Sequence, residues 1–130
     1  MEYKRRIFGF DCDVYGHLNN AKYLQIYEEA RADALEQMEM PIRKLRDLGI
    51  SIYITSLEMK FKKGIPLEEM ITVKSTVTKL NKAISVWEQR IFDEKDELCN
   101  IAIVKGAFVA GGKVSRLPDE IYEHFLKYKD

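Results

Sequence analysis

The most constraining feature of this sequence is one long helical pattern that precedes four consecutive strand-like segments. From Asn20 to Met38, apolar residues recur at steps of three and four, which is the period of an α-helix. More of the circumference is apolar or small than the stripe of a surface helix requires. We therefore expect a long helix that the rest of the chain wraps around. Its periodic positions are Tyr23, Leu24, Tyr27, Ala30, Ala34, Leu35 and Met38.

The segments after the helix are rich in Ile, Val, Thr, Tyr and Phe, and short turn sequences separate them. Ile71, Val73 and Val77 alternate with polar residues, as in a strand with one buried face. Because the connections are short, we expect consecutive strands to be antiparallel neighbours. A first strand over residues 2–10, short helices over 41–47 and 118–129 and a polar hinge over 111–113 complete the pattern. The later strands are predicted over residues 51–62, 69–80, 83–93 and 97–110.

This order predicts an α+β domain over residues 1–130, in which a five-stranded antiparallel sheet wraps around one long central helix. Five strands cannot enclose a helix completely. The uncovered side predicts association with a second copy, by extension of the sheet edge to edge, which would also protect the exposed strand edges. A homodimer is therefore expected.

Charge and composition exclude several classes of function. The 21 basic and 21 acidic residues cancel, so neither a nucleic-acid binder nor a polybasic membrane anchor is indicated. No apolar run is long enough to cross a membrane and no signal peptide is recognisable, so we expect a cytoplasmic protein. Cys12 and Cys99 are then expected to stay reduced. His17 and His124 lie far apart, so no metal site is predicted.

The segment from Asp11 to Asn20 concentrates reactive groups just before the helix. It holds two carboxylates, a thiol, an imidazole and two amides. A helix start offers backbone N–H groups without intrahelical partners, and these stabilise a developing oxyanion. A nearby carboxylate could attack a thioester or deprotonate water. The same residue types are also ordinary loop and capping residues, with Asn19 or Asn20 suited to the N-cap, so spacing alone leaves a structural role open.

The segment from Phe10 to Arg31 resembles the signature of the 4-hydroxybenzoyl-CoA thioesterase family, within the hot-dog superfamily. The family pattern is D-x-D-x-x-G-H-x-N-N-x-x-Y, followed by E-x-x-R. Its DVYGHLNN form is most similar to the bacterial branch that acts on long-chain acyl-CoA. The resemblance implies a hot-dog fold and acyl-CoA thioesterase activity without a cofactor. Every marked position is filled, by Asp11, Asp13, Gly16, His17, Asn19, Asn20, Tyr23, Glu28 and Arg31.

Carried over residue by residue, the resemblance implies that Asp13 is the catalytic carboxylate and Asp11 a supporting acid. The backbone N–H of Asn20 would polarise the thioester carbonyl, while Asn19 and His17 would shape the loop and position water or the carboxylate. The family offers both nucleophilic and general-base accounts of the aspartate, and the sequence does not choose between them. The resemblance also implies that dimers associate further into homotetramers.

Other residues have less specific expectations. Tyr23 and Tyr27 are core residues by their spacing and could also line an acyl pocket. The phosphates of coenzyme A could meet a basic cluster at a subunit edge, formed by Lys60, Lys62 and Lys63.

Two further pairs have spacing that permits an interaction. Glu28 and Arg31 lie three residues apart on the helix, a spacing that permits an ion pair. Cys12 with His17 as its base would be a rival nucleophile, but the flanking aspartates would raise the thiol pKa, which disfavours the thiolate.

The substrate remains open at this stage. Medium- to long-chain fatty acyl-CoA is the main expectation, and acyl carrier protein thioesters and aromatic acyl-CoA are alternatives that use the same aspartate. A non-catalytic acyl-CoA-binding protein of the same fold is the alternative from another class. It would have no use for the carboxylate of Asp13.

Overall fold

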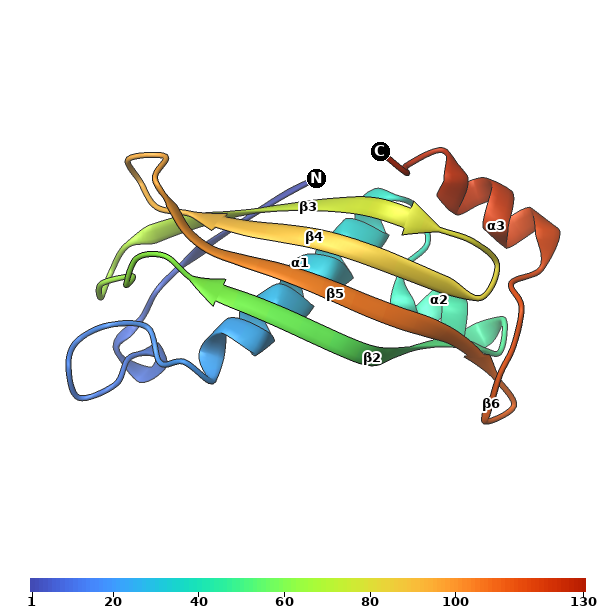
Figure 1. Ribbon diagram of the computed structural model, residues 1–130, viewed down its shortest axis with the longest axis horizontal. Coiled ribbons are helices and arrows are strands. Elements are labelled where there is room, and N and C mark those ends of the chain that lie inside the picture. Colours follow the sequence, from blue (N-terminus) through green and yellow to red (C-terminus); the bar gives the residue numbers. More distant parts are fainter.

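The computed structural model describes all 130 residues and shows a long helix packed against a curved sheet (Figure 1). All the strands except β1 follow the long helix in sequence, and the sheet lies across it in space. The strands are β1 (Glu2–Arg6), β2 (Ile50–Phe61), β3 (Met70–Leu80), β4 (Ile84–Phe92), β5 (Leu98–Ala110) and β6 (Lys113–Val114). The helices are α1 (Lys22–Gln37), α2 (Ile42–Asp47) and α3 (Asp119–Leu126), and a 3-10 turn spans Gly9–Asp11.

The sheet is antiparallel throughout, with the strand order β1-β3-β4-β5-β2 and the short β6 paired to β5. This arrangement confirms the predicted α+β hot-dog fold, in which five principal strands wrap around one central helix. Both edge strands, β1 and β2, lack a neighbour on their outer side. None of the helices is both long and apolar enough to cross a bilayer.

One expectation about the sheet was wrong: β2 and β3 are consecutive in sequence but are not neighbours. β2 pairs with β5 and β3 lies three positions away. Three strand spacings amount to about 14 Å, and the connecting residues 62–69 can extend over about 25 Å, so this crossover segment can pass across the end of the sheet. Short connections favour the pairing of consecutive strands, but this connection is long enough for β2 and β3 to lie apart in the sheet.

The core lies between α1 and the concave face of the sheet. The α1 side chains of Tyr23, Tyr27, Ala30 and Ala34 are all buried, as the helical period predicted, and Ile26 is buried with them. They pack with apolar residues of the strands in one cluster, which includes the alternating residues Ile71, Val73 and Val77 of β3. One periodic position differs, because Leu24 lies on the side of α1 that the sheet leaves uncovered and is 48% exposed.

Two further segments differ from expectation. The first strand ends at Arg6, and the chain then forms the 3-10 turn rather than continuing extended to Phe10. The polar hinge after β5 is a tight hairpin, in which Gly111 and Gly112 take positive φ values of 60° and 76° and let β6 pair back onto β5. The other helices and strands begin and end within three residues of the predicted bounds.

Candidate active-site loop

The segment between the 3-10 turn and α1 folds as a closed loop with an exposed tip. Cys12 and Leu18 form an antiparallel bridge at its base, and the Asp13 N–H donates to the His17 carbonyl at 2.9 Å. Gly16 closes the turn by donating to the Asp13 carbonyl at 3.1 Å, with a φ of +79° that favours glycine. The backbone therefore fixes Asp13 at a defined point of the loop.

The crossover segment between β2 and β3 supports this loop from the side. Leu18 donates its N–H to the Ile65 carbonyl at 2.7 Å, and Leu67 donates to the Gly16 carbonyl at 3.2 Å. Ile65 is fully buried, and the His17 ring lies against Gly64. The sequence identified this segment only as a turn. Its supporting role could not be read locally, because its partners lie almost fifty residues away in the chain.

The Asp13 carboxylate is oriented by its own loop and is only partly buried. Its Oδ1 accepts the Tyr15 N–H at 2.9 Å, with a longer contact of 3.5 Å from the His17 N–H. Its Oδ2 accepts no hydrogen bond from the chain. One oxygen thus fixes the direction of the carboxylate, and the other can face a ligand or water.

The start of α1 leaves a donor without an acceptor. The Asn19 side chain accepts the Ala21 N–H at 3.0 Å, and the Asn19 carbonyl accepts the Lys22 N–H at 2.9 Å. The Asn20 N–H has no acceptor in the chain. Ala21 occupies the N-cap position without a side-chain cap, so the expected Asn cap was wrong by at least one residue. The free N–H lies at the positive end of the α1 dipole, where a negative oxygen is stabilised.

Asp11 has a different environment from Asp13, because it is fully buried and fully paired. Arg5 donates to both carboxylate oxygens, at 2.8 and 3.0 Å, and the Phe8 N–H donates to Oδ2 at 2.9 Å. The Arg5 hydrogen bonds hold the pKa of Asp11 below its usual range. Asp11 therefore anchors the loop and is not free to reach a substrate. No pattern in the sequence singles out Arg5, which is one of several basic residues on β1.

Cys12 is a poor candidate for the nucleophile. Burial raises the pKa of its thiol, and the charges of Asp11 and Asp13 raise it further. Its Sγ lies 3.5 Å from the Phe8 carbonyl, and it makes no hydrogen bond with His17. These observations agree with the direction expected from its acidic neighbours, since a catalytic thiol needs a lowered pKa.

Comparison with known proteins matches residues 10–125 to the family model described as the thioesterase-like superfamily. The chain belongs to this superfamily. The match confirms the predicted class of enzyme, a thioester hydrolase. The matched residues include the whole loop and end near the C-terminus of α3, so the likeness extends well beyond the loop signature.

Individual relatives of this superfamily cover most of the chain. A long-chain acyl-CoA thioesterase, FadM, from Escherichia coli is 29% identical over 70% of this chain and 68% of its own length. An acyl-CoA thioesterase, YbgC, from Haemophilus influenzae is 24% identical over 95% of this chain and 93% of its own length. The crystal structure of a hypothetical protein from Aquifex aeolicus superposes with a TM-score of 0.90 at 25% identity, covering 95% and 98% of the two chains.

In this thioesterase-like chain the two tyrosines of α1 lie in the core. The Tyr23 ring packs edge-on against Phe61, with centroids 5.0 Å apart, and burial raises the pKa of Tyr23 to about 12. Tyr27 is fully buried and donates its hydroxyl to Asn100 Oδ1 at 2.7 Å. Tyr23, in the first turn of α1, is thus separated from solvent by the half-exposed Phe61, whereas Tyr27 is fully enclosed in the core.

The three candidate lysines have different surroundings. Lys60 and Lys62 are exposed at the end of β2 and just after it. Lys63 forms ion pairs with Asp93, at 2.6 Å, and with Glu97. Hydrogen bonds from Lys63 to these two carboxylates raise its pKa, and their negative charges balance its positive charge. Lys60 and Lys62 are therefore freer to meet an anion than Lys63 is.

The motif residues Glu28 and Arg31 do not form the expected ion pair. No nitrogen of Arg31 lies within 4.0 Å of a Glu28 oxygen, and Arg31 Nη1 instead donates to Gln89 Oε1 at 2.8 Å. Gln89 is buried on β4 and donates to the Tyr27 carbonyl at 3.1 Å and Ser75 Oγ at 3.0 Å. The guanidinium is directed inward to this buried polar chain, which a helical spacing rule cannot foresee.

Proposed function

We propose that this thioester hydrolase acts on acyl-coenzyme A and that Asp13 is its catalytic carboxylate. The observation that carries the proposal is the pairing of two free groups within one loop. Asp13 has an oriented carboxylate with an unoccupied oxygen, and Asn20 has a backbone N–H without an acceptor. A thioester hydrolase needs one group to act at the carbonyl carbon and another to stabilise its oxygen.

In the proposed reaction the thioester oxygen accepts the Asn20 N–H, at the positive end of the α1 dipole. Asp13 then acts in one of two ways. Either its free oxygen attacks the carbonyl carbon, expels the thiolate and forms an anhydride that water hydrolyses, or it takes a proton from the water that attacks. Both routes yield the free acid and the thiol. The loop geometry supports either one.

The neighbouring residues have supporting roles in this proposal. His17 and Asn19 shape the loop, His17 through its carbonyl and Asn19 through its side chain. Tyr23 lines the acyl site, with Tyr27 packed behind it. Lys60 and Lys62 attract the phosphates of coenzyme A, with a smaller contribution from Lys63 because its charge is paired.

We propose a medium- to long-chain fatty acyl group as the substrate. The relatives named as long-chain acyl-CoA and acyl-CoA thioesterases support this choice. Acyl carrier protein thioesters and aromatic acyl-CoA are the alternatives that the same loop would serve.

We also propose that the chain works as a homodimer, with further pairing to a homotetramer. The exposed outer edge of β2 supports a second copy at this position, and Tyr53, Ile54 and Phe61 on β2 are each about half exposed. Sedimentation at several protein concentrations measures the state directly. A monomer at all of them would contradict this part.

Thiol release from short-chain, long-chain and aromatic acyl-CoA, and from an acyl carrier protein thioester, tests the proposal. We expect the wild type to hydrolyse at least one long-chain ester and Asp13→Asn to lose 100-fold or more of kcat, on the order of a general-base contribution. Asp47→Asn, an exposed aspartate on α2, is the matched control and should keep full activity. Circular dichroism checks the fold of each variant.

Three outcomes would contradict parts of the proposal. Undiminished activity of Asp13→Asn would exclude Asp13 as the catalytic carboxylate. Hydrolysis of carrier-protein thioesters alone would move the substrate to that class. Tight binding of acyl-CoA without any hydrolysis would indicate the non-catalytic protein instead.

A further inference from the structure

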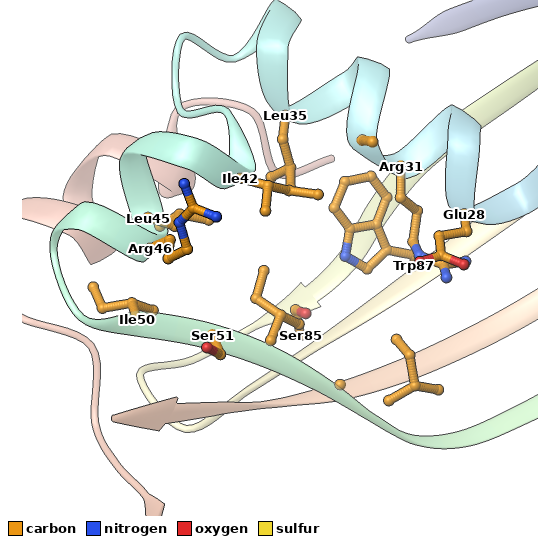
Figure 2. A pocket seen from close by; sticks show the side chains of 14 residues that line it. Glu28, Arg31, Leu35, Ile42, Leu45, Arg46, Ile50, Ser51, Ser85 and Trp87 are labelled. Atoms are coloured by element: carbon orange, nitrogen blue, oxygen red, sulfur yellow. The ribbon is translucent and has the colours of Figure 1, made fainter. Parts of the chain in front are cut away.

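A cavity of about 270 Å³ lies between α1, α2, β2 and β4, apart from the loop that carries Asp13. Figure 2 shows side chains from these elements surrounding the space. Arg31 follows Lys22, the first residue of α1, by nine residues, which places it about 14 Å along the axis of α1 from the helix start. The volume is close to the lower end for small-molecule pockets, about 300 Å³. Its apolar walls include Leu35, Ile42, Leu45, Ile50, Ile52 and Ile54.

Hydrogen-bond donors without protein acceptors line one side of this cavity. Ser85 is only 4% exposed, and its buried hydroxyl makes no hydrogen bond. The indole nitrogen of Trp87 also makes no hydrogen bond in the chain, and Figure 2 shows it turned toward the space. Buried polar groups normally find a partner, in the protein or in a bound molecule. The buried Ser85 hydroxyl therefore indicates an acceptor in the cavity, and the Trp87 N–H, which the chain does not fully enclose, can donate to the same acceptor.

The charges around the cavity favour an anion. Arg31 and Arg46 contribute two positive charges against one negative charge from Glu28. Only one of the five guanidinium N–H donors of Arg31 is used, toward Gln89. Burial lowers the pKa of Arg31, and the charge of Glu28, which acts in the opposite direction, only partly offsets this effect. An anion beside the guanidinium would supply the remaining compensation.

We propose that this cavity binds a small amphipathic monocarboxylate, with its carboxylate on the Arg31 guanidinium and its hydrocarbon body against the apolar wall. A planar carboxylate matches the two parallel donors of a guanidinium, and Ser85 and Trp87 can donate to the same group. The apolar wall excludes a fully hydrated anion such as phosphate. This site is distinct from the proposed catalytic loop and does not depend on the role assigned to Asp13.

Trp87 is the only tryptophan in the chain, so its fluorescence reports the cavity directly. The probe is sodium octanoate, and octan-1-ol provides the same hydrocarbon body without charge. We expect saturable change of the emission with octanoate and at least tenfold weaker binding of octan-1-ol. Arg31→Gln should weaken octanoate binding by about tenfold or more, as expected for loss of a charge-assisted pair, and should leave octan-1-ol binding unchanged.

Three further variants make the test specific. Arg31→Lys keeps the charge and should retain octanoate binding within a few-fold, which separates charge from a disturbed fold. Arg43→Gln, on the exposed side of α2, is the matched control and should bind octanoate as the wild type does. Asp13→Asn should also bind octanoate normally, even if it hydrolyses nothing, so the two proposals can fail separately.

The proposal is overturned if octanoate causes no saturable change in Trp87 emission, or if Arg31→Gln binds it as tightly as the wild type. Equal affinity for octanoate and octan-1-ol would also overturn it, because the cavity would then be only an apolar pocket. Tighter octanoate binding by Asp13→Asn, together with wild-type affinity in Arg31→Gln, would show that the carboxylate binds at the catalytic loop instead, because the substitution removes a repelling negative charge there.

Discussion

Arg5 donates to both carboxylate oxygens of Asp11 through the two terminal nitrogens of its guanidinium: Nη1 lies 2.8 Å from Oδ2, and Nη2 lies 3.0 Å from Oδ1. Arg5 Nε also donates to Glu29 Oε1 on α1 at 2.9 Å. One side chain of β1 thus joins the first residue of the loop signature to the middle of the central helix. This connection fixes the base of the loop that holds Asp13.

Removing Arg5 should destabilise the chain strongly. Arg5→Ala leaves the buried Asp11 carboxylate with the Phe8 N–H and the more distant Lys22 ammonium, 3.7 Å from Oδ1. Breaking a buried ion pair costs about 3–5 kcal/mol, and Lys22 places the expected loss toward the lower end of this range. Arg43→Ala, at an exposed position of α2, should change the free energy of unfolding by less than about 0.5 kcal/mol. Urea denaturation of both variants measures the difference. Equal midpoints for the two variants would contradict the anchoring role of Arg5.

The same pair predicts a pH dependence of stability. The pKa of Asp11 is lowered in the folded chain, chiefly by Arg5, so the unfolded chain binds a proton at higher pH than the folded chain does. This contribution is complete above the unfolded pKa, near pH 4, and is lost as the pH falls through the folded pKa. We expect the free energy of unfolding to fall below about pH 4, and less steeply in Asp11→Asn. A parallel fall in both proteins would contradict the linkage.

Much of the fold was predictable because its periodic patterns are local. The helical period of α1 and the alternation in β3 both follow from neighbouring residues, and their buried faces are as expected. The order of the strands in the sheet was less accessible. Nothing near Phe61 or Met70 shows that the chain between them crosses the sheet, because that course is set by the pairing of β3 with β1.

The site was predictable in its residues but not in its supports. The loop signature marks Asp11, Asp13 and Asn20 without distinguishing their surroundings. The structure distinguishes them, since Asp11 is buried against Arg5 whereas Asp13 keeps a free oxygen. Arg5 comes from another strand, and sequence spacing gives no measure of contacts between distant segments. The inward course of Arg31 was unforeseen for the same reason.

The hydrogen bond between Tyr27 and Asn100 should contribute measurably to stability. Asn100 Nδ2 has no partner already, so Tyr27→Phe would leave both polar atoms of the buried amide unsatisfied. We expect a loss of about 1–3 kcal/mol in the free energy of unfolding. Tyr128→Phe, whose hydroxyl makes no hydrogen bond in the chain, is the control and should cost little. Chemical denaturation compares them, and a neutral Tyr27→Phe would contradict this role.

The close approach of Gly64 in the crossover segment to the His17 ring offers a test of how precisely the loop must be held. A Cβ at Gly64 would lie 3.3 Å from His17 Cδ2, closer than most side-chain contacts, so Gly64→Ala should push the His17 ring and shift the loop. At Gly9 the nearest atom to an added Cβ is Leu67 Cδ1 at 3.9 Å, an ordinary contact. Gly9→Ala is therefore the matched control.

We expect Gly64→Ala to lower kcat on the best acyl-CoA substrate by about tenfold and Gly9→Ala to leave it unchanged, because small displacements of catalytic groups are costly. The free energy of unfolding of both variants should lie within about 1 kcal/mol of the wild-type value. Unchanged kcat in Gly64→Ala would show that the loop tolerates movement of His17 and that the crossover segment supports only the fold.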